Sequence, residues 1–196
     1  MEKLIKSVVA ESIAVKQAIL ESESLLQTVT EVARVCVNCL QQGGKILFAG
    51  NGGSAADAQH LAAELSGRFY VDREPLYAEA LHVNTSYLTA VANDYAYEEV
   101  YARMVRAAGR KGDVLIAMTT SGNSENILRA AADAKKLGMH VVGMTGQTGG
   151  QLAPLSDYLI NIPSRTTPRI QEGHMLLGHL LCELIEGELF GYKIKK

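Results

Sequence analysis

The 196-residue sequence contains few cysteines, no excess of charge of either sign and no long apolar run. No apolar stretch approaches the ~20 residues that a membrane-spanning helix needs, so we expect no membrane association. Residues 1–7 carry charges where a signal peptide would have its apolar core, and the three cysteines suit a reducing compartment, so we expect a cytoplasmic protein. A formal net charge of -2 gives no broad attraction to nucleic acid.

Two of the three cysteines, Cys36 and Cys39, form a C-x-x-C pair, which is a spacing found in redox and metal sites. They lie within a helical apolar pattern and the sequence has no second such pair, so we interpret them as core residues and keep redox or metal chemistry as the alternative. The length and the 47% hydrophobic content are sufficient for one domain with a full core, spanning residues 1–196.

The chain is organised around residues 45–64, which predict a strand, a tight glycine turn and a helix. Residues 46–49 form a short apolar run typical of a strand buried on both faces. The glycines at 50, 52 and 53 allow a sharp turn and the close approach of a ligand to the backbone. The helix that follows begins with free N–H groups and the positive end of its dipole, which attract an anion.

His60 and Glu64 stand four residues apart in that helix and therefore share one face of it. An imidazole and a carboxylate in this arrangement can bind a divalent metal ion or act as an acid/base pair. The alternative is an ordinary surface pair. The glycine turn just upstream favours a functional role.

The rest of the chain alternates between strand and helix patterns. We expect further strands at 75–82, 113–118, 140–145 and 158–162, and helices at 3–22, 24–42, 85–92, 97–108, 125–137 and 166–189. This alternation predicts an α/β fold with a parallel sheet covered on both faces, preceded by a helical hairpin in residues 1–42, with the α/β core in 43–196. The apolar face of the first helix could pack on its own domain or on another subunit.

A second chemical feature is the hydroxyl-rich loop Thr119, Thr120, Ser121 and Ser124, between a predicted strand and a predicted helix. Hydroxyls and free helix N–H groups can bind a phosphate without a cationic side chain. Helix capping is the simpler explanation, but one hydroxyl is enough for a cap. Because the chain lacks both the nucleotide P-loop and the dinucleotide fingerprint, we expect a small phosphorylated metabolite here. The similar loop at 145–150 lacks the dense hydroxyls, and we interpret it as a turn.

The last helix carries Gln171, Met175 and His179 on one stripe, with His174 on a different face. A single histidine in an apolar helix is usually a hydrogen-bonded core residue, which is our interpretation of His174. Gln171 is polar in an otherwise apolar segment and can offer a carbonyl oxygen to a metal ion or a substrate.

Together these motifs resemble the bacterial phosphoheptose isomerase family of sugar-isomerase (SIS) domain proteins. The resemblance is carried by the turn at 50–54 with His60 and Glu64, by Asn93 and Asp94, by the loop at 120–124, and by residues 169–172 with His179. It covers nearly the whole chain. Thr119 replaces a serine common in this family and keeps the hydroxyl. Pro168 stands where some members have an acidic residue, so an acid/base role for that position does not carry over.

The resemblance implies a Rossmann-like five-stranded parallel sheet, a homotetramer with active sites between subunits, and one Zn²⁺ per subunit. The implied zinc ligands are His60, Glu64, Gln171 and His179. The implied substrate contacts are Asn51, Gly52, Gly53, Glu64, Asn93, Asp94, Thr119, Thr120, Ser121, Ser124 and Gln171, with the hydroxyl group of residues holding a phosphate.

The implied reaction converts sedoheptulose 7-phosphate into D-glycero-manno-heptose 7-phosphate, which supplies the heptose of lipopolysaccharide or other surface glycans. Moving a carbonyl from C2 to C1 requires a base and an acid that work near neutral pH. Our hypothesis is that Glu64 is the base and His179 the acid, although a zinc ligand is a poorer base than a free carboxylate. A divalent ion would polarise the carbonyl and stabilise the enediolate.

Other members of the same family leave alternatives. One is a non-catalytic adapter that binds the replication initiator protein. In that relative the positions matching Glu64 and His179 are not retained, so their presence here favours the enzyme. A sugar-phosphate-sensing module usually accompanies a DNA-binding domain, for which this chain has no room. A different ketose phosphate substrate is harder to exclude.

Overall fold

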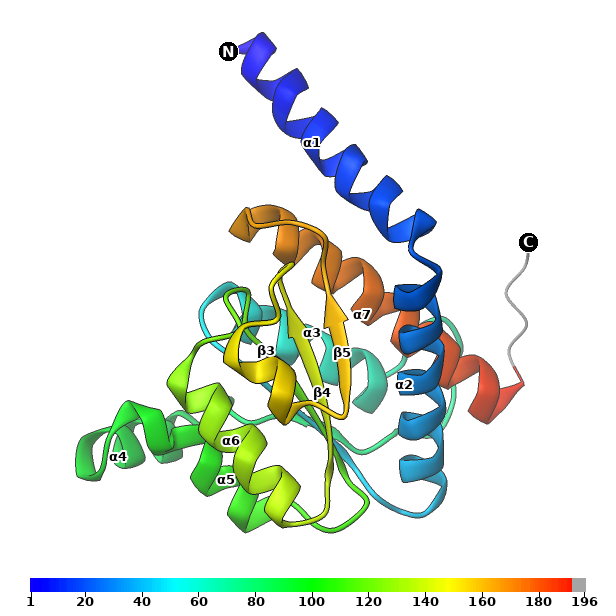
Figure 1. Ribbon diagram of the computed structural model, residues 1–196. Coiled ribbons are helices and arrows are strands. Elements are labelled where there is room, and N and C mark those ends of the chain that lie inside the picture. Colours follow the sequence, from blue (N-terminus) through cyan, green and yellow to red (C-terminus); the bar gives the residue numbers. More distant parts are fainter. Residues whose placement is uncertain (192–196) are drawn as a thin grey trace.

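The computed structural model describes residues 1–191, which form a five-stranded, all-parallel sheet between helices (Figure 1). The strand order is β2-β1-β3-β4-β5. The strands are β1 (Ile46–Gly50), β2 (Ala78–Ala80), β3 (Val114–Met118), β4 (His140–Thr145) and β5 (Tyr158–Asn161). The α/β sheet expected from the alternating pattern is confirmed.

Helices cover both faces of the sheet. The first face carries α2 (Glu23–Gln41), α3 (Gly53–Ser66) and α7 (Thr167–Phe190), and the second carries α5 (Val100–Ala108) and α6 (Glu125–Lys136), with α4 (Thr85–Asp94) beside α5. Strand β1 shows why both faces must be covered. Ile46 and Phe48 join the core under α2, α3 and α7, whereas Leu47 and Ala49 join the core under α5 and α6. A strand buried on both faces reads as a continuous apolar run.

The sheet brings two predicted loops together. Strands β1 and β3 are neighbours, paired from Ile46 with Val114 to Gly50 with Met118, and every residue of both strands is buried. The chain leaves β1 toward α3 on the first face, and leaves β3 toward α6 on the second face. In open α/β sheets, ligands bind in the crevice that opens where consecutive connections diverge in this way.

Four local features differ from the expectation. Strand β2 is only three residues long. Short 3-10 helices, η1 (Tyr97–Glu99) and η2 (Gly150–Leu155), stand where we expected continuous helix and a simple turn. The sequence favours Thr167 as the N-cap of α7 and Pro168 as its first residue, whereas in the structure Thr166 occupies the N-cap position and Pro168 the second helical position. Two glycines with positive φ, Gly149 and Gly150, form the start of η2, and side-chain patterns do not reveal such a start.

The cysteines lie in the core. Cys36, Cys39 and Cys182 are all buried and free, which confirms the core interpretation of the C-x-x-C pair. Burial raises the pKa of the Cys39 thiol to about 11, with the carboxylate of Asp113 as the second cause. Burial likewise raises the pKa of the Cys36 thiol. Neither thiol is poised to act as a nucleophile or metal ligand near neutral pH.

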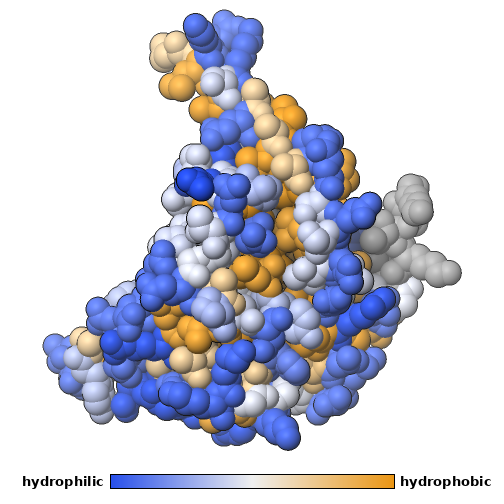
Figure 2. Space-filling model, in the orientation of Figure 1, coloured by the Kyte–Doolittle hydropathy of each residue, from blue (hydrophilic) through white to orange (hydrophobic). Residues whose placement is uncertain are grey.

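Helix α1 (Glu2–Glu21) projects from the body of the chain (Figure 1). Only Ile19 of this helix is buried, and apolar side chains are visible along the projecting part in Figure 2. The exposed apolar residues of α1 are Leu4, Ile5, Val8, Val9, Ile13 and Leu20. Among residues 1–191, no helix combines the length and the apolar character that crossing a membrane requires.

Candidate active site

The glycine turn after β1 has the tight geometry that the sequence predicts. Gly52 caps α3 with a φ of 56°, a conformation that side chains disfavour. At Gly53 a Cβ atom would collide with the side-chain amide of Gln171 on α7. A side chain at position 53 would therefore have to displace Gln171, which lies directly beside this predicted substrate contact.

Two turns further along α3, three predicted metal ligands converge. The Nε2 atom of His60 lies 2.9 Å from the carboxylate of Glu64 and 3.0 Å from Nε2 of His179, which comes from α7. One ligand atom from each residue falls within 4.8 Å of the others. A tetrahedral zinc site holds its nitrogen and oxygen ligands roughly 3.3 Å apart, given bonds of about 2.0–2.1 Å. Two imidazoles and a carboxylate that still face solvent thus fit a divalent metal with an open position.

The fourth expected ligand lies elsewhere in this chain. Gln171 precedes His179 by eight residues, which is about 12 Å along the helix axis at 1.5 Å per residue. It contacts Gly53, whereas His179 contacts His60. The structure therefore brings three of the four implied ligands together, and groups Gln171 with the glycine turn.

A loop that the sequence did not single out supports the metal cluster. Phe69 stacks on the imidazole of His179, with ring centroids 5.6 Å apart and an interplanar angle of 23°. The fully buried carboxylate of Glu186 on α7 accepts hydrogen bonds from the backbone N–H groups of residues 69, 70 and 71. Arg73 pairs with this carboxylate at 3.0 Å, and its guanidinium also donates to the backbone carbonyl of Glu64 at 2.9 Å.

The hydroxyl loop at the end of β3 is assembled as a cluster. The Oγ1 atom of Thr119 lies 2.9 Å from Oγ of Ser124 and 3.4 Å from Oγ of Ser121. Ser124 occupies the N-cap position of α6, yet its side chain makes no capping hydrogen bond. The hydroxyl of Ser124 is therefore not engaged in helix capping. The free N–H groups at the start of α6 strengthen an anion site at this point.

The segment after β4 holds the hydroxyl loop in place. The N–H of Gly146 donates to the carbonyl of Thr120, and the N–H of Leu152 in η2 donates to the carbonyl of Gly122. Gly122 itself has a φ of 71° and packs against the backbone of Gly149. The loop that we interpreted as a simple turn therefore positions the predicted phosphate site, even though it has few hydroxyls of its own.

Asn93 and Asp94 end helix α4 on the second face of the sheet. Both are exposed, and Asn93 donates a hydrogen bond to Asp94 at 2.9 Å. Among residues 1–191, no side-chain hydrogen bond joins either one to the other predicted site residues. The link to the site is Tyr97, three residues later, whose hydroxyl donates to Asn51 at 3.1 Å.

Two further polar groups near the site escaped the sequence analysis. The carboxylate of Asp57, one turn before His60, has a buried oxygen with no hydrogen-bond partner among the described residues. Burial raises the pKa of Asp57, although the neighbouring His60 opposes the shift. The buried Asn126 of α6 pairs with Asn51. A buried helical Asn or Asp is indistinguishable in sequence from one that faces solvent.

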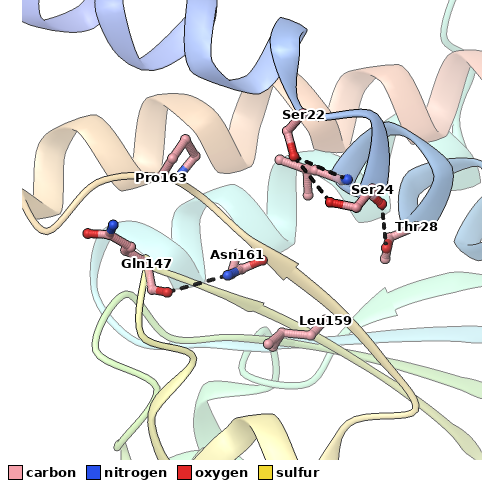
Figure 3. Close-up of a pocket in the computed structure, with 8 residues that line it drawn as sticks. Ser22, Ser24, Thr28, Gln147, Leu159, Asn161 and Pro163 are labelled. Carbon is pink, nitrogen blue, oxygen red and sulfur yellow. Dashed lines mark hydrogen bonds between the residues drawn. The ribbon is translucent and has the colours of Figure 1, made fainter.

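A separate polar pocket of about 240 Å³ lies at the edge of the sheet, between the start of α2 and β5. Figure 3 shows Ser24, Gln147 and Asn161 around it. None of the predicted site residues lines this pocket. We take as the candidate active site the loops that follow β1 and β3, together with the facing sides of α3 and α7, and we refer to the region between these two loops as the crevice.

His174, which we interpreted as a core residue, is fully buried, and its Nε2 lies 3.1 Å from the carbonyl of Thr145. Its Nδ1 has no partner among the described residues, so the ring is only partly satisfied. Burial lowers the pKa of His174 to about 4, which keeps the imidazole neutral.

Comparison with known proteins identifies the family. Residues 9–146 match the model of the SIS domain. The chain is 54% identical over 183 residues to the phosphoheptose isomerase of Burkholderia pseudomallei (strain 1710b), covering 93% of each chain. It is 50% identical to that of Aneurinibacillus thermoaerophilus, covering 98% of each.

Solved structures agree with the sequence relatives. The structure of phosphoheptose isomerase GmhA from Neisseria gonorrhoeae superposes with a TM-score of 0.89 at 43% identity, covering 95% of this chain and 98% of that one. A phosphoheptose isomerase from Francisella tularensis gives a TM-score of 0.90 at 38% identity, covering 93% and 96%. With the matching SIS domain and relatives above 50% identity over nearly the full length, the chain belongs to the SIS-domain family of phosphoheptose isomerases.

Proposed function

We propose that this chain is an aldose–ketose isomerase that converts sedoheptulose 7-phosphate into D-glycero-manno-heptose 7-phosphate. The observation that carries the proposal is the meeting of Glu64 and His179 from two separate helices at one solvent-accessible cluster. The relatives in the same family are named phosphoheptose isomerases, which supports this choice of reaction. The product would feed heptose synthesis for lipopolysaccharide or other surface glycans. We further propose a cytoplasmic location, because the three cysteines are all free, as expected in a reducing compartment.

The reaction moves hydrogen within one molecule, so it needs no external oxidant. In our proposal the carboxylate of Glu64 removes a proton from C1 of the ketose and returns it to C2. The imidazole of His179 gives a proton to the C2 oxygen and accepts one from the C1 hydroxyl. C1 becomes an aldehyde and C2 a secondary alcohol. The enediolate between these two states carries the negative charge that the site must stabilise.

We propose Zn²⁺ as the ion that His60, Glu64 and His179 hold. Two imidazole nitrogens and one carboxylate oxygen are a donor set that zinc accepts with a position left open. Bound there, the ion would polarise the substrate carbonyl and stabilise the developing negative charge. Phe69 stacks on the ring of His179, and Arg73 donates a hydrogen bond to the backbone carbonyl of Glu64. These contacts would fix the orientation of two of the metal ligands.

Substrate contacts are proposed along the crevice. The hydroxyls of Thr119, Thr120, Ser121 and Ser124 would hold the phosphate, and Asn51, Gly52, Gly53, Asn93, Asp94 and Gln171 would contact the sugar. Thr119 and Ser124 already face one another at 2.9 Å, and the start of α6 adds a favourable dipole. Glu64 belongs to both groups, since it would contact the sugar during proton transfer.

We propose a homotetramer with active sites shared between subunits. Helix α1 exposes a line of apolar side chains that a neighbouring copy would cover, for example Ile5 at 62% and Ile13 at 61% exposure. Replacing Ile5 and Ile13 by Glu should dissociate the assembly, as measured by light scattering. A double variant that stays tetrameric would contradict this interface.

The activity can be tested directly. The metal-loaded protein is incubated with sedoheptulose 7-phosphate, and aldose formation is followed by NMR with and without a chelator. We expect conversion that the chelator stops and Zn²⁺ restores. Glu64→Gln should abolish turnover with the fold intact, whereas Glu31→Gln, in an exposed pair with Gln27 on α2, should not. Near-normal turnover in Glu64→Gln would end the assignment of the base. No conversion by the wild-type protein would end the proposed reaction.

Nothing in the structure or in the relatives reported above favours the non-catalytic adapter. Glu64 and His179, whose loss characterises the adapter in the family resemblance, are present and close together. The relatives compared above are named phosphoheptose isomerases.

A further inference from the structure

An unusual hydrogen-bonded pair links the two loops of the crevice. The Nδ2 atom of Asn51 donates to Oδ1 of Asn126 at 2.9 Å, and Nδ2 of Asn126 donates back to Oδ1 of Asn51 at 2.9 Å. Asn51 follows β1, and Asn126 stands in the first turn of α6, which follows β3. The two primary amides therefore form a closed reciprocal pair across the point where the connections diverge.

Tyr97 completes the hydrogen bonding of the same amide. Its hydroxyl donates to Oδ1 of Asn51 at 3.1 Å. An amide oxygen has two lone pairs, and here both have a donor, one from Asn126 and one from Tyr97. Asn51 is left with one free side-chain N–H, so toward a ligand it can only donate. Tyr97 has used its single proton, so its oxygen can only accept.

Burial separates the roles of the two partners. Asn126 is 4% exposed, so it is too deeply covered to contact a substrate. Tyr97 is 47% exposed and lies between Asn51 and the end of α4, where Asn93 and Asp94 are also exposed. Asn126 can therefore act only by positioning Asn51, whereas the exposed oxygen of Tyr97 can contact a ligand directly.

We propose that Asn126 positions Asn51 for substrate binding, and that the oxygen of Tyr97 accepts a hydrogen bond from a hydroxyl group of the polyhydroxy substrate. The proposal rests on the proposed function, because it takes Asn51 as a sugar contact. It gives the crevice a fixed polarity, with one donor at Asn51 and one acceptor at Tyr97. An isostere that lacks the hydroxyl facing Tyr97 would leave that acceptor unpaired and would bind less well.

The first test removes the Tyr97 hydroxyl, which is both the proposed acceptor and a donor to Asn51. In Tyr97→Phe the ring stays and the oxygen is lost. We expect KM for sedoheptulose 7-phosphate to rise about threefold to tenfold, with kcat within about twofold, because a bond to a hydroxyl away from the reacting carbonyl contributes to binding before and during the reaction. Tyr95→Phe is the matched control. The ring of Tyr95 lies 4.0 Å from the guanidinium of Arg103. Removing the Tyr95 hydroxyl should leave KM unchanged.

The second test breaks the amide pair without changing its shape. In Asn126→Asp a carboxylate oxygen replaces the donor that faces the Asn51 oxygen, so one bond is lost and two acceptors oppose each other. We expect kcat/KM to fall by about tenfold or more, since a misplaced contact weakens transition-state binding. Asn38→Asp, on the exposed face of α2, introduces the same charge and should have no effect. The double variant with Tyr97→Phe should lose less than the product of the two single losses, because both act through Asn51.

A crystal structure of Asn126→Asp separates this inference from the proposed reaction. We expect a folded protein in which the Asn51 amide has left its present position, and this outcome does not depend on any activity. An unmoved Asn51 would overturn the positioning role of Asn126, and an unchanged KM in Tyr97→Phe would overturn the acceptor role. If the wild-type protein fails to isomerise the sugar phosphate, the proposed reaction and with it the acceptor role fall. The crystal structure still decides whether Asn126 holds Asn51.

Discussion

The most informative single perturbation is Arg73→Met, because Arg73 connects the metal cluster to the core. Its side chain is 2% exposed and pairs with Glu186, whose side chain is 0% exposed. Its guanidinium also donates to the carbonyl groups of residues 64, 65, 67 and 74. The substitution keeps much of the apolar stem and removes the charge, so the carboxylate loses its cationic partner and these carbonyls lose their donor.

The expected loss of stability is large. Removing one partner of a buried ion pair typically costs about 3–5 kcal/mol, because the remaining charge is left uncompensated in a poorly solvated position. For a chain of this size, each kcal/mol lowers Tm by about 2–4 °C, so the midpoint should fall by about 6–20 °C. Denaturant unfolding and calorimetry at one fixed protein concentration measure both quantities.

Controls separate the buried pair from ordinary surface charge. Arg129→Met removes an arginine that pairs with Glu99 and Glu125 but is 44% exposed, and should leave Tm and the denaturation midpoint nearly unchanged. Adding Glu186→Gln to Arg73→Met should recover part of the loss, because the buried charge disappears while an oxygen remains for the backbone N–H groups of the loop. A cost below about 1 kcal/mol for Arg73→Met would refute the reasoning.

Three further outcomes follow from individual contacts. Burial lowers the pKa of His174 from about 6.5 in the unfolded chain to about 4 in the folded one. Lowering the pH through this window therefore favours the unfolded state and should lower the free energy of unfolding by about 3 kcal/mol. The variant His174→Gln should lack this pH dependence. Gly53→Ala should displace Gln171 and lower kcat/KM at least about tenfold with little change in Tm, because the clashing atoms are the far end of a flexible side chain. Ser124→Ala should raise KM and weaken inhibition by inorganic phosphate about fivefold, with kcat nearly unchanged, as steady-state kinetics would show. A stability difference between the wild type and His174→Gln that does not change with pH would contradict the first argument. An unchanged kcat/KM in Gly53→Ala would contradict the second, and an unchanged KM in Ser124→Ala the third.

Features with a local cause were predictable from the sequence. Strand β1 follows from its apolar run, and the sharp turn follows from the glycines at 50–53, since both signals lie within a few residues. His60 and Glu64 share a face because helical spacing dictates it. The approach of His179 was expected from the family resemblance only, because no local pattern reports which face of α7 meets α3.

Features with a distant cause were not predictable. Glu186 and Arg73 are 113 residues apart, and each looks like an ordinary surface charge in the sequence. Asn126 looks like a residue that favours the start of a helix, although its partner is Asn51, 75 residues earlier. Helix η2 was missed because left-handed glycines, rather than a side-chain pattern, set its start. Polar groups that are satisfied by tertiary contacts carry no periodic signal.

The helix pair α3–α7 decides whether the proposed chemistry is possible at all. Gln171 packs against Gly53 near one end of the pair, and Leu61 packs against Gly178 further along, where a Cβ would lie only 2.6 Å from Leu61. These two close contacts fix the register of one helix against the other. A slip of one residue would turn His179 by about 100° around its axis, away from His60. The acid, the base and the metal ligands are therefore aligned by two points of close packing that themselves carry no charge.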